Sequence, residues 1–174
     1  MSKRILLAVA LLVLVCGIAK SDIVTFNVTM SGLQEVPANP SLGTAVATAT
    51  FNTTTGAMSI TGSFSGLTGL SSAAHLHGFA AAGTNAGVLF GMSSLTTGAT
   101  SGTFSGSGTI SAGNITNTLN GLTYLNLHSN VFPGGEIRGQ LINPVPEPAT
   151  FAALAIGGVV CIGLRRRFSS KQGT

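Results

Sequence analysis

The chain has 174 residues, a formal net charge of +4, two cysteines and no tryptophan. Seven of its eight Lys and Arg residues lie among the first 20 and the last ten positions, and Arg138 is the only one between them. The central segment therefore lacks the basic patch that nucleic-acid binding requires, and we expect no nucleic-acid partner. Cys16 and Cys161 also lie in the two terminal segments of the sequence, so the central segment cannot form an internal disulfide.

The N-terminus has the pattern of a secretory signal peptide. Two basic residues precede an apolar stretch over residues 5–18, and small residues at Ala19 and Ser21 fit the positions that signal peptidase reads. We predict cleavage between Ser21 and Asp22.

The segment from 22 to 143 alternates apolar and polar residues over short runs broken by glycine. Over residues 23–30, for example, Phe26 and Val28 share one face and Thr25 and Asn27 share the other, which is typical of a half-buried strand. Residues 52–56 have the length and composition of a hairpin connection. We predict strands at residues 23–30, 44–51, 57–64, 75–77, 88–92, 102–110, 124–128 and 136–142. Eight such strands indicate an all-β domain, an antiparallel β-sandwich or barrel.

The three histidines fall on polar faces of the predicted strands. His75 and His77 are two residues apart and therefore project from the same face of their strand. By the same parity, His128 lies on the polar face of its strand, as Glu136 and Arg138 do on theirs. If these strands are neighbours, His75, His77, His128 and Glu136 can gather into a site suited to Zn²⁺ or Cu²⁺.

The alternative interpretation is a structural network without a metal. Asn126 and Arg138 lie on the same polar faces, so Glu136 can pair with Arg138 or with a histidine, and His128 can bridge its strand to the turn at 133–135. A single His-x-His pair does not distinguish the two interpretations, and both stay open. The cofactor is therefore either none, or Zn or Cu at the histidine cluster.

The sequence contains no other complete catalytic pattern. We find no Gly-x-Ser-x-Gly elbow between a strand and a helix. Glu35 and Glu136, taken as paired carboxylates, lack the aromatic platforms of sugar hydrolases, because Tyr124 is the single tyrosine. We therefore expect a protein that is not an enzyme. A metal-dependent redox or hydrolytic enzyme is the alternative, and a polysaccharide-binding module with Tyr124 as its platform is a third interpretation.

The C-terminal segment has the pattern of a membrane anchor. Pro146 and Pro148 flank Glu147 and delay the start of any helix. Residues 149–164 carry no charge and are slightly fewer than the roughly 20 that span a bilayer, so flanking residues complete the predicted transmembrane helix. A buried helix of a soluble domain is disfavoured because this segment has no polar stripe. The residues that hold this end in the cytoplasm by the positive-inside rule are Arg165, Arg166 and Arg167.

Two family resemblances cover most of the chain. The segments SGLQEVP at 31–37, AAHLHG at 73–78, YLNLHSN at 124–130 and PGGEIRGQL at 133–141 resemble the CHRD domain, first described in chordin. This resemblance implies an immunoglobulin-like β-sandwich, proposed from limited similarity to Cu/Zn superoxide dismutases, and it implies no established activity. Those dismutases also use a His-x-His pair, but they need further histidines, an aspartate and a disulfide that this domain lacks. The tail resembles the PEP-CTERM sorting signal, which exosortases process.

We therefore predict four segments: a signal peptide at 1–21, a CHRD-like β domain at 22–143, a sorting and anchor segment at 144–168 and a cytoplasmic tail at 169–174. Signal peptidase and exosortase are the expected processing enzymes. The protein is expected to be exported, anchored in the inner membrane by its C-terminal helix, and then transferred to the cell surface or extracellular matrix. Its expected role is structural or binding, with a surface polysaccharide or protein as partner.

Overall fold

The computed structural model of the chain describes residues 22–142. The predicted signal peptide, the sorting and anchor segment with its transmembrane helix, and the cytoplasmic tail lie outside this range. Within residues 22–142, no helix is both long enough and apolar enough to cross a membrane.

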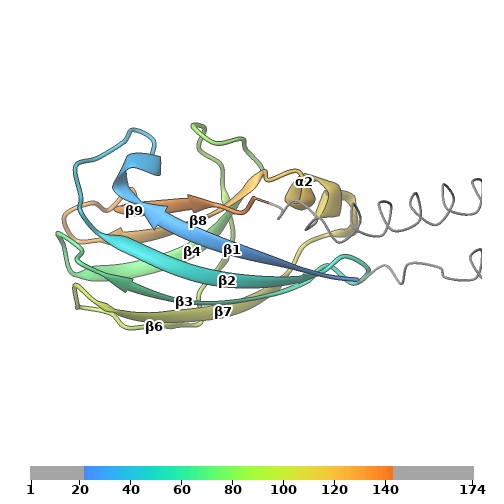
Figure 1. Ribbon diagram of the computed structural model, residues 1–174, viewed down its shortest axis with the longest axis horizontal. Helices are drawn as coiled ribbons and strands as arrows, with labels where there is room; N and C mark the ends of the chain where they lie inside the picture. Colours follow the sequence, from blue (N-terminus) through green and yellow to red (C-terminus); the bar gives the residue numbers. More distant parts are fainter. Residues whose placement is uncertain (1–21, 143–174) are drawn as a thin grey trace, which may run out of the picture.

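The described residues form one antiparallel sheet of nine strands (Figure 1). Their order across the sheet is β5-β4-β8-β9-β1-β2-β3-β7-β6. The strands are β1 (Ile23–Ser31), β2 (Thr44–Asn52), β3 (Ala57–Ser65), β4 (Ser71–Gly78), β5 (Val88–Gly91), β6 (Ser94–Leu95), β7 (Gly102–Thr109), β8 (Thr123–Ser129) and β9 (Ile137–Gln140). The short helices are η1 (Gly32–Gln34), η2 (Ala112–Asn114) and α2 (Ile115–Leu119). The prediction of an antiparallel all-β domain is confirmed.

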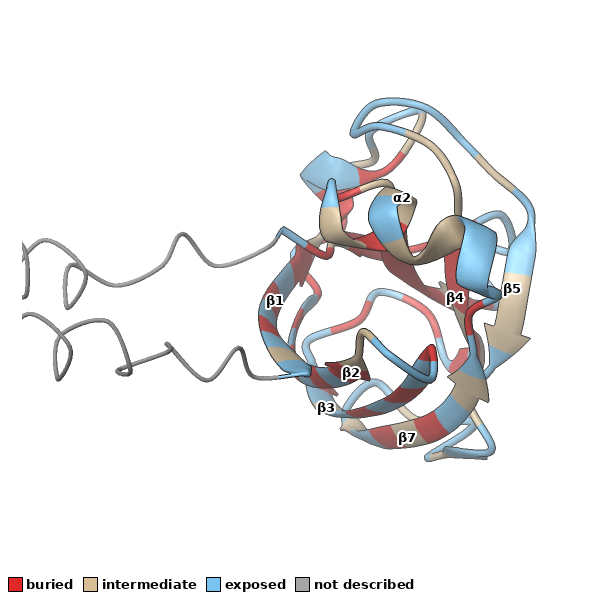
Figure 2. Cartoon of the chain, turned by 90° about the vertical axis from the view of Figure 1, so that its right-hand side faces the viewer, coloured by how far each residue is buried: buried red, intermediate tan, exposed pale blue. Residues whose placement is uncertain are grey.

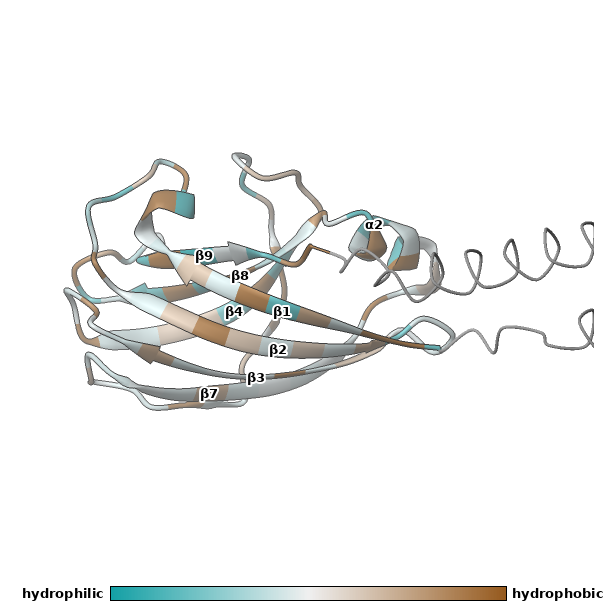
Figure 3. Cartoon of the chain, in the orientation of Figure 1, coloured by the Kyte–Doolittle hydropathy of each residue, from teal (hydrophilic) through white to brown (hydrophobic). Residues whose placement is uncertain are grey.

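Alternation of side chains produces the two faces of the sheet. In β1, Phe26 and Val28 are buried while Thr25 and Asn27 are exposed, and the hydropathy of the ribbon alternates accordingly (Figure 3). The predicted hairpin is also confirmed, because β2 and β3 pair along their length. In its turn the Asn52 side chain accepts hydrogen bonds from the backbone N–H groups of the two residues at 54 and 55, at 2.9 and 2.8 Å.

The sheet curls into a half-barrel around its core (Figure 2). Its edge strands β5 and β6 follow one another in sequence, separated only by Met92 and Ser93. Phe90 of β5 packs against β7 where Gly108 has no side chain, since a Cβ on this glycine would lie 2.4 Å from the Phe90 ring. The connection between the edge strands thus spans the opening of the half-barrel. The immunoglobulin-like sandwich expected from the resemblance stays a prediction.

Besides the short helices η1 and η2, the sequence did not predict β6 and α2, and β4 is longer than predicted. β6 has two residues and α2 has five, so neither is long enough to show a periodic pattern. α2 exists because Ile115 and Leu119 pack against the core from one side of a single turn. β4 begins at Ser71, four positions earlier than its apolar pattern indicates, because it pairs with β8 from Ser129 onward.

Candidate metal centre

The outer face of three neighbouring strands carries the predicted histidines together with Asn126 and Arg138. β4, β8 and β9 lie side by side, with His75 opposite Asn126 and Asn126 opposite Arg138. Leu125 and Ile137 belong to the buried core, so the residues that alternate with them face away from it. The strand neighbours on which the site depends are therefore present.

Two loops cover part of this outer face. Residues 32–43 and 79–87 rise above β8 and β9 (Figure 1). The Asn85 side chain joins them by donating to the Val36 carbonyl at 2.9 Å. The loops bury side chains that would otherwise be exposed on the sheet, and Tyr124 and Arg138 are each 1% exposed.

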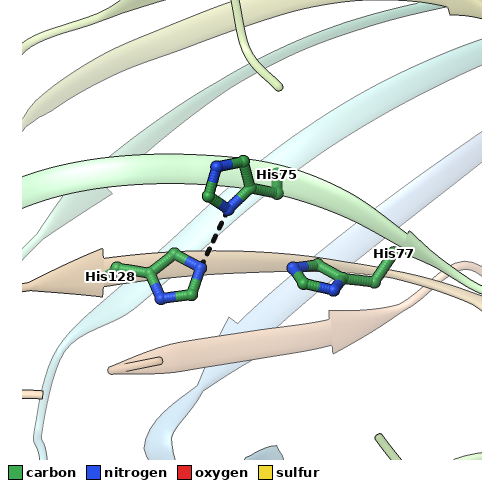
Figure 4. Close-up of side chains that lie close together, drawn as sticks. All are labelled: His75, His77 and His128. Carbon is green, nitrogen blue, oxygen red and sulfur yellow. Dashed lines mark hydrogen bonds between the residues drawn. The ribbon is translucent and has the colours of Figure 1, made fainter. Parts of the chain in front are cut away.

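The structure brings the three histidines together. His75 and His77 come from β4 and His128 from β8, and one nitrogen from each lies within 4.8 Å of the others (Figure 4). His75 Nδ1 is 3.0 Å from His128 Nε2. Nitrogens bound to one tetrahedral zinc ion at about 2.1 Å lie about 3.4 Å apart, so side-chain rotations that move the nitrogens by roughly 1–1.5 Å are needed to bring all three to a common ion.

Backbone carbonyls fix the orientation of two of the rings. His77 Nδ1 lies 3.0 Å from the Ala86 carbonyl, and His128 Nδ1 lies 3.0 Å from the Pro133 carbonyl in the predicted turn. A carbonyl oxygen only accepts, so each Nδ1 carries the proton and each Nε2 keeps a lone pair. Metal-binding histidines are held in this way by the nitrogen that does not bind the metal.

The His77 ring has a second support. It stacks on the Tyr124 ring with a centroid distance of 4.9 Å and an interplanar angle of 9°. The Arg138 guanidinium lies 3.4 Å from the centre of the Tyr124 ring, and it donates to Asn85 Oδ1, to the Thr84 carbonyl and to Gln140 Oε1. His77 Nε2 is buried and has no hydrogen-bond partner among residues 22–142. The ring is thus held firmly while its lone pair faces the cluster.

The surroundings of His75 and His77 favour the neutral form of these two rings. Burial lowers the pKa of His75, and the nearby His128 and His77 lower it further. Burial also lowers the pKa of His77, which outweighs the opposing hydrogen bond to Ala86. Neutral imidazole is the form that binds metal. His128 Nε2 accepts from His75 Nδ1, so a metal bound at His75 Nδ1 would require the His75 proton to move to its Nε2.

Glu136 is not part of the cluster. It is fully buried, and its carboxylate accepts hydrogen bonds from the Ser41 hydroxyl and from the backbone N–H groups of Thr68 and Gly69. Burial alone raises the pKa of Glu136, but the hydrogen bonds from these groups and from Ser129 outweigh it and lower the pKa. The structure therefore places Glu136 as an anchor between loops, away from the histidines and from Arg138.

Sequence reasoning missed the role of Glu35. The residue is 7% exposed, and burial raises the pKa of its carboxyl group to about 7 although Arg138 and the Val36 N–H oppose the shift. Glu35 Oε1 and Asn126 Oδ1 are both buried without a partner in the described part of the chain. Both contact Gly135, which has φ of +138° and no room for a Cβ. The sequence feature that could have pointed to Glu35 is its position in the CHRD-like segment at residues 31–37.

The comparison with protein families decides what this domain is. Residues 26–141 match the CHRD domain. The chain belongs to the CHRD family. The histidine cluster, Glu35, Glu136 and Arg138 all lie inside the matched range of the CHRD domain. No curated protein and no solved structure matches the chain.

A second match begins directly after the CHRD domain. Residues 144–167 match the PEP-CTERM protein-sorting motif, and this range contains the predicted Pro146, Glu147 and Pro148 as well as the arginines at 165–167. The motif implies processing by an exosortase. This CHRD protein is therefore an exported protein of the cell envelope that is sorted to the surface.

Proposed function

We propose that this CHRD protein binds a divalent transition metal, Zn²⁺ or Cu²⁺, at its surface through His75, His77 and His128. The observation that carries the proposal is the convergence of three imidazole nitrogens, two of them from rings whose other nitrogen bonds a backbone carbonyl. Neutral nitrogen ligands of this kind suit Zn²⁺ and Cu²⁺ better than Mg²⁺ or Ca²⁺. The Glu136 carboxylate, expected as a fourth ligand, does not contribute.

We propose binding, in a structural or binding role in the cell envelope, rather than catalysis. Neither of the two buried carboxylates of the domain supports catalysis at the site, because Glu136 accepts hydrogen bonds from residues of two loops and Glu35 lies next to Gly135 in the turn at 133–135. The protein is further proposed to stay in the inner membrane through residues 149–164 until exosortase releases it to the surface or matrix.

A metal-dependent hydrolytic or redox enzyme is the second candidate. It is favoured by the half-buried positions of His75 and His128, which leave one side of the cluster accessible to solvent. Three histidines leave a tetrahedral ion one position for water, as in catalytic zinc sites. A dismutase-like reaction would need a redox-active copper at this site.

Elemental analysis of the full exported protein, purified in detergent without an affinity His tag, tests the proposal. We expect close to one Zn or Cu per chain after reconstitution, and loss of that metal in the His75→Ala/His77→Ala variant. A Ser72→Ala variant, changed on an exposed position of the same strand, is the matched control and should keep its metal. Folded parent protein that takes up no metal would refute the proposal.

Activity assays on the metal-loaded protein also distinguish the binding role from the enzyme. Superoxide dismutation and ester hydrolysis are measured for the parent and for the double histidine variant. Activity that follows the metal content would favour the enzyme, whereas metal binding without either activity supports the binding role.

A further inference from the structure

The exposed face of β1, β2, β3 and β7 carries side-chain hydroxyls in a regular array. Strand register aligns Asn27, Thr48, Thr61 and Ser105 in one row across four strands, and Ser94 of β6 continues this row. Asn27, Thr48 and Thr61 are exposed and Ser105 is half-buried. We call this alignment the middle row.

Rows with the same chemistry lie on both sides of the middle row. The row on one side consists of Thr25, Thr50, Ser59 and Ser107. The row on the other side consists of Thr29, Val46, Ser63 and Thr103. These three rows together form what we call the hydroxyl face. Rows lie two residues apart along each strand, about 6.8 Å, and neighbours within a row are about 4.8 Å apart.

The hydroxyl face carries no ionisable side chain. Among residues 22–142 the Asp, Glu, Lys and Arg side chains are those of Asp22, Glu35, Glu136 and Arg138, and the last three are buried. Soluble domains usually have roughly 25–35% charged residues on their surface. Threonine is favoured in strands, and lysine and glutamate are only mildly disfavoured there, so strand propensity does not account for the missing lysines and glutamates. The absence of charge favours a neutral partner, because a charged one would lose hydration without gaining a counter-charge.

The shape of the face narrows the choice of partner. Figure 2 shows β1, β2, β3 and β7 curling around the core, so that their exposed side is convex. Two convex faces of this kind touch over a small area, which disfavours a second copy of the chain. A linear polymer can follow a convex surface. The strand spacing of about 4.8 Å is close to the advance per residue of an extended β-linked hexose chain.

We propose that the hydroxyl face binds a neutral polysaccharide, an extended β-linked hexose polymer that lies across the strands along the rows. Each serine or threonine hydroxyl both donates and accepts, as each sugar hydroxyl does, so the two surfaces are complementary. Single hydrogen bonds of this type contribute little net affinity, and binding depends on several along a row. The aromatic platform expected at Tyr124 is not available, because this ring is buried between His77 and Arg138.

Co-sedimentation of the full exported protein with microcrystalline cellulose and with insoluble β-1,3-glucan particles tests this proposal. Thr48→Val/Thr61→Val removes two hydroxyls of the middle row while keeping shape and strand propensity. We expect the parent to bind at least one neutral glucan and the variant to bind about tenfold more weakly, as expected for two lost hydrogen bonds. Thr97→Val/Thr116→Val makes the same change at exposed positions outside the face and should bind like the parent.

Several results would overturn the proposal. Binding to neither glucan, equal binding by the Thr48→Val/Thr61→Val variant, or sedimentation with an anionic alginate gel alone would each do so. Self-association of the parent that the variant loses, measured by sedimentation velocity, would identify a second copy as the occupant. The His75→Ala/His77→Ala variant should bind glucan normally, so failure of the metal site and failure of the hydroxyl face can be told apart.

Discussion

Glu35→Gln should remove one component of the dependence of stability on pH. The Glu35 carboxyl is buried beneath Gly135 and beside Asn126, and the one charged group that opposes its burial is Arg138. Burial raises the pKa of Glu35 from 4.5 to about 7, so the folded protein holds a proton that the unfolded chain releases. The stabilisation is complete below pH 4.5 and is lost as the pH rises to about 7, and it amounts to at most about 3 kcal/mol.

Glutamine imitates the protonated carboxyl and does not titrate. We expect parent and Glu35→Gln to have similar free energies of unfolding at pH 5, and the variant to be the more stable at pH 8. His75, His77 and Glu136 have lowered pKa values, so each of them makes stability increase with pH over its own range. The difference between parent and variant removes these shared contributions.

Urea unfolding at pH 5, 6, 7 and 8, with a chelator present, measures this difference. Asn39→Asp, a change of one polar side chain in the same loop, serves as a comparison that introduces a carboxyl group instead of removing one. If the free energies of unfolding of parent and Glu35→Gln change with pH in parallel, the Glu35 carboxyl is ionised in the folded protein. That result would refute the argument that burial keeps it protonated.

Three further predictions concern the loops and the metal centre. Glu136→Ala leaves three donors without their acceptor, two of them buried, and should lower the free energy of unfolding by about 3 kcal/mol in urea; an unchanged midpoint would contradict this role. Gly135→Ala forces a Cβ against Asn126 and Glu35 at a positive φ and should cost about 2 kcal/mol or more, measured in the same way. Zn²⁺ at about 100 times its Kd should stabilise the parent by about 2.7 kcal/mol in thermal unfolding, and His77→Ala should abolish this gain; equal gains in both proteins would exclude the cluster as the site.

Local alternation was sufficient to predict most of the strands. The Phe26 and Val28 pattern in β1 and the Asn52 turn after β2 are properties of neighbouring residues, and the structure follows them. That His75 and His77 lie on the same face of their strand also follows from their spacing in the sequence alone. Which strands become neighbours depends on contacts between distant residues, and the order β4-β8-β9 could only be assumed.

The partners of buried charges were harder to predict. Parity placed Glu136 on the polar face with Arg138, but Glu136 precedes β9, where strand parity no longer applies, and its carboxylate meets Ser41 and Thr68 instead. Arg138 is enclosed by the loop at 79–87, and its hydrogen bonds to Thr84 and Asn85 form only when that loop folds over the sheet. Loop positions of this kind carry no periodic signal.

The link of Met92 and Ser93 between the edge strands bears on solubility. Exposed strand edges can recruit strands from other molecules, and proteins usually prevent this with charged residues at the edges. Here β5 has four residues and β6 has two, and they succeed one another along the chain, so neither edge offers a long run of unpaired backbone groups. The short, consecutive edge strands therefore limit edge-to-edge pairing on a surface with few charges, and lengthening the link between them should promote assembly of the domain through its edges.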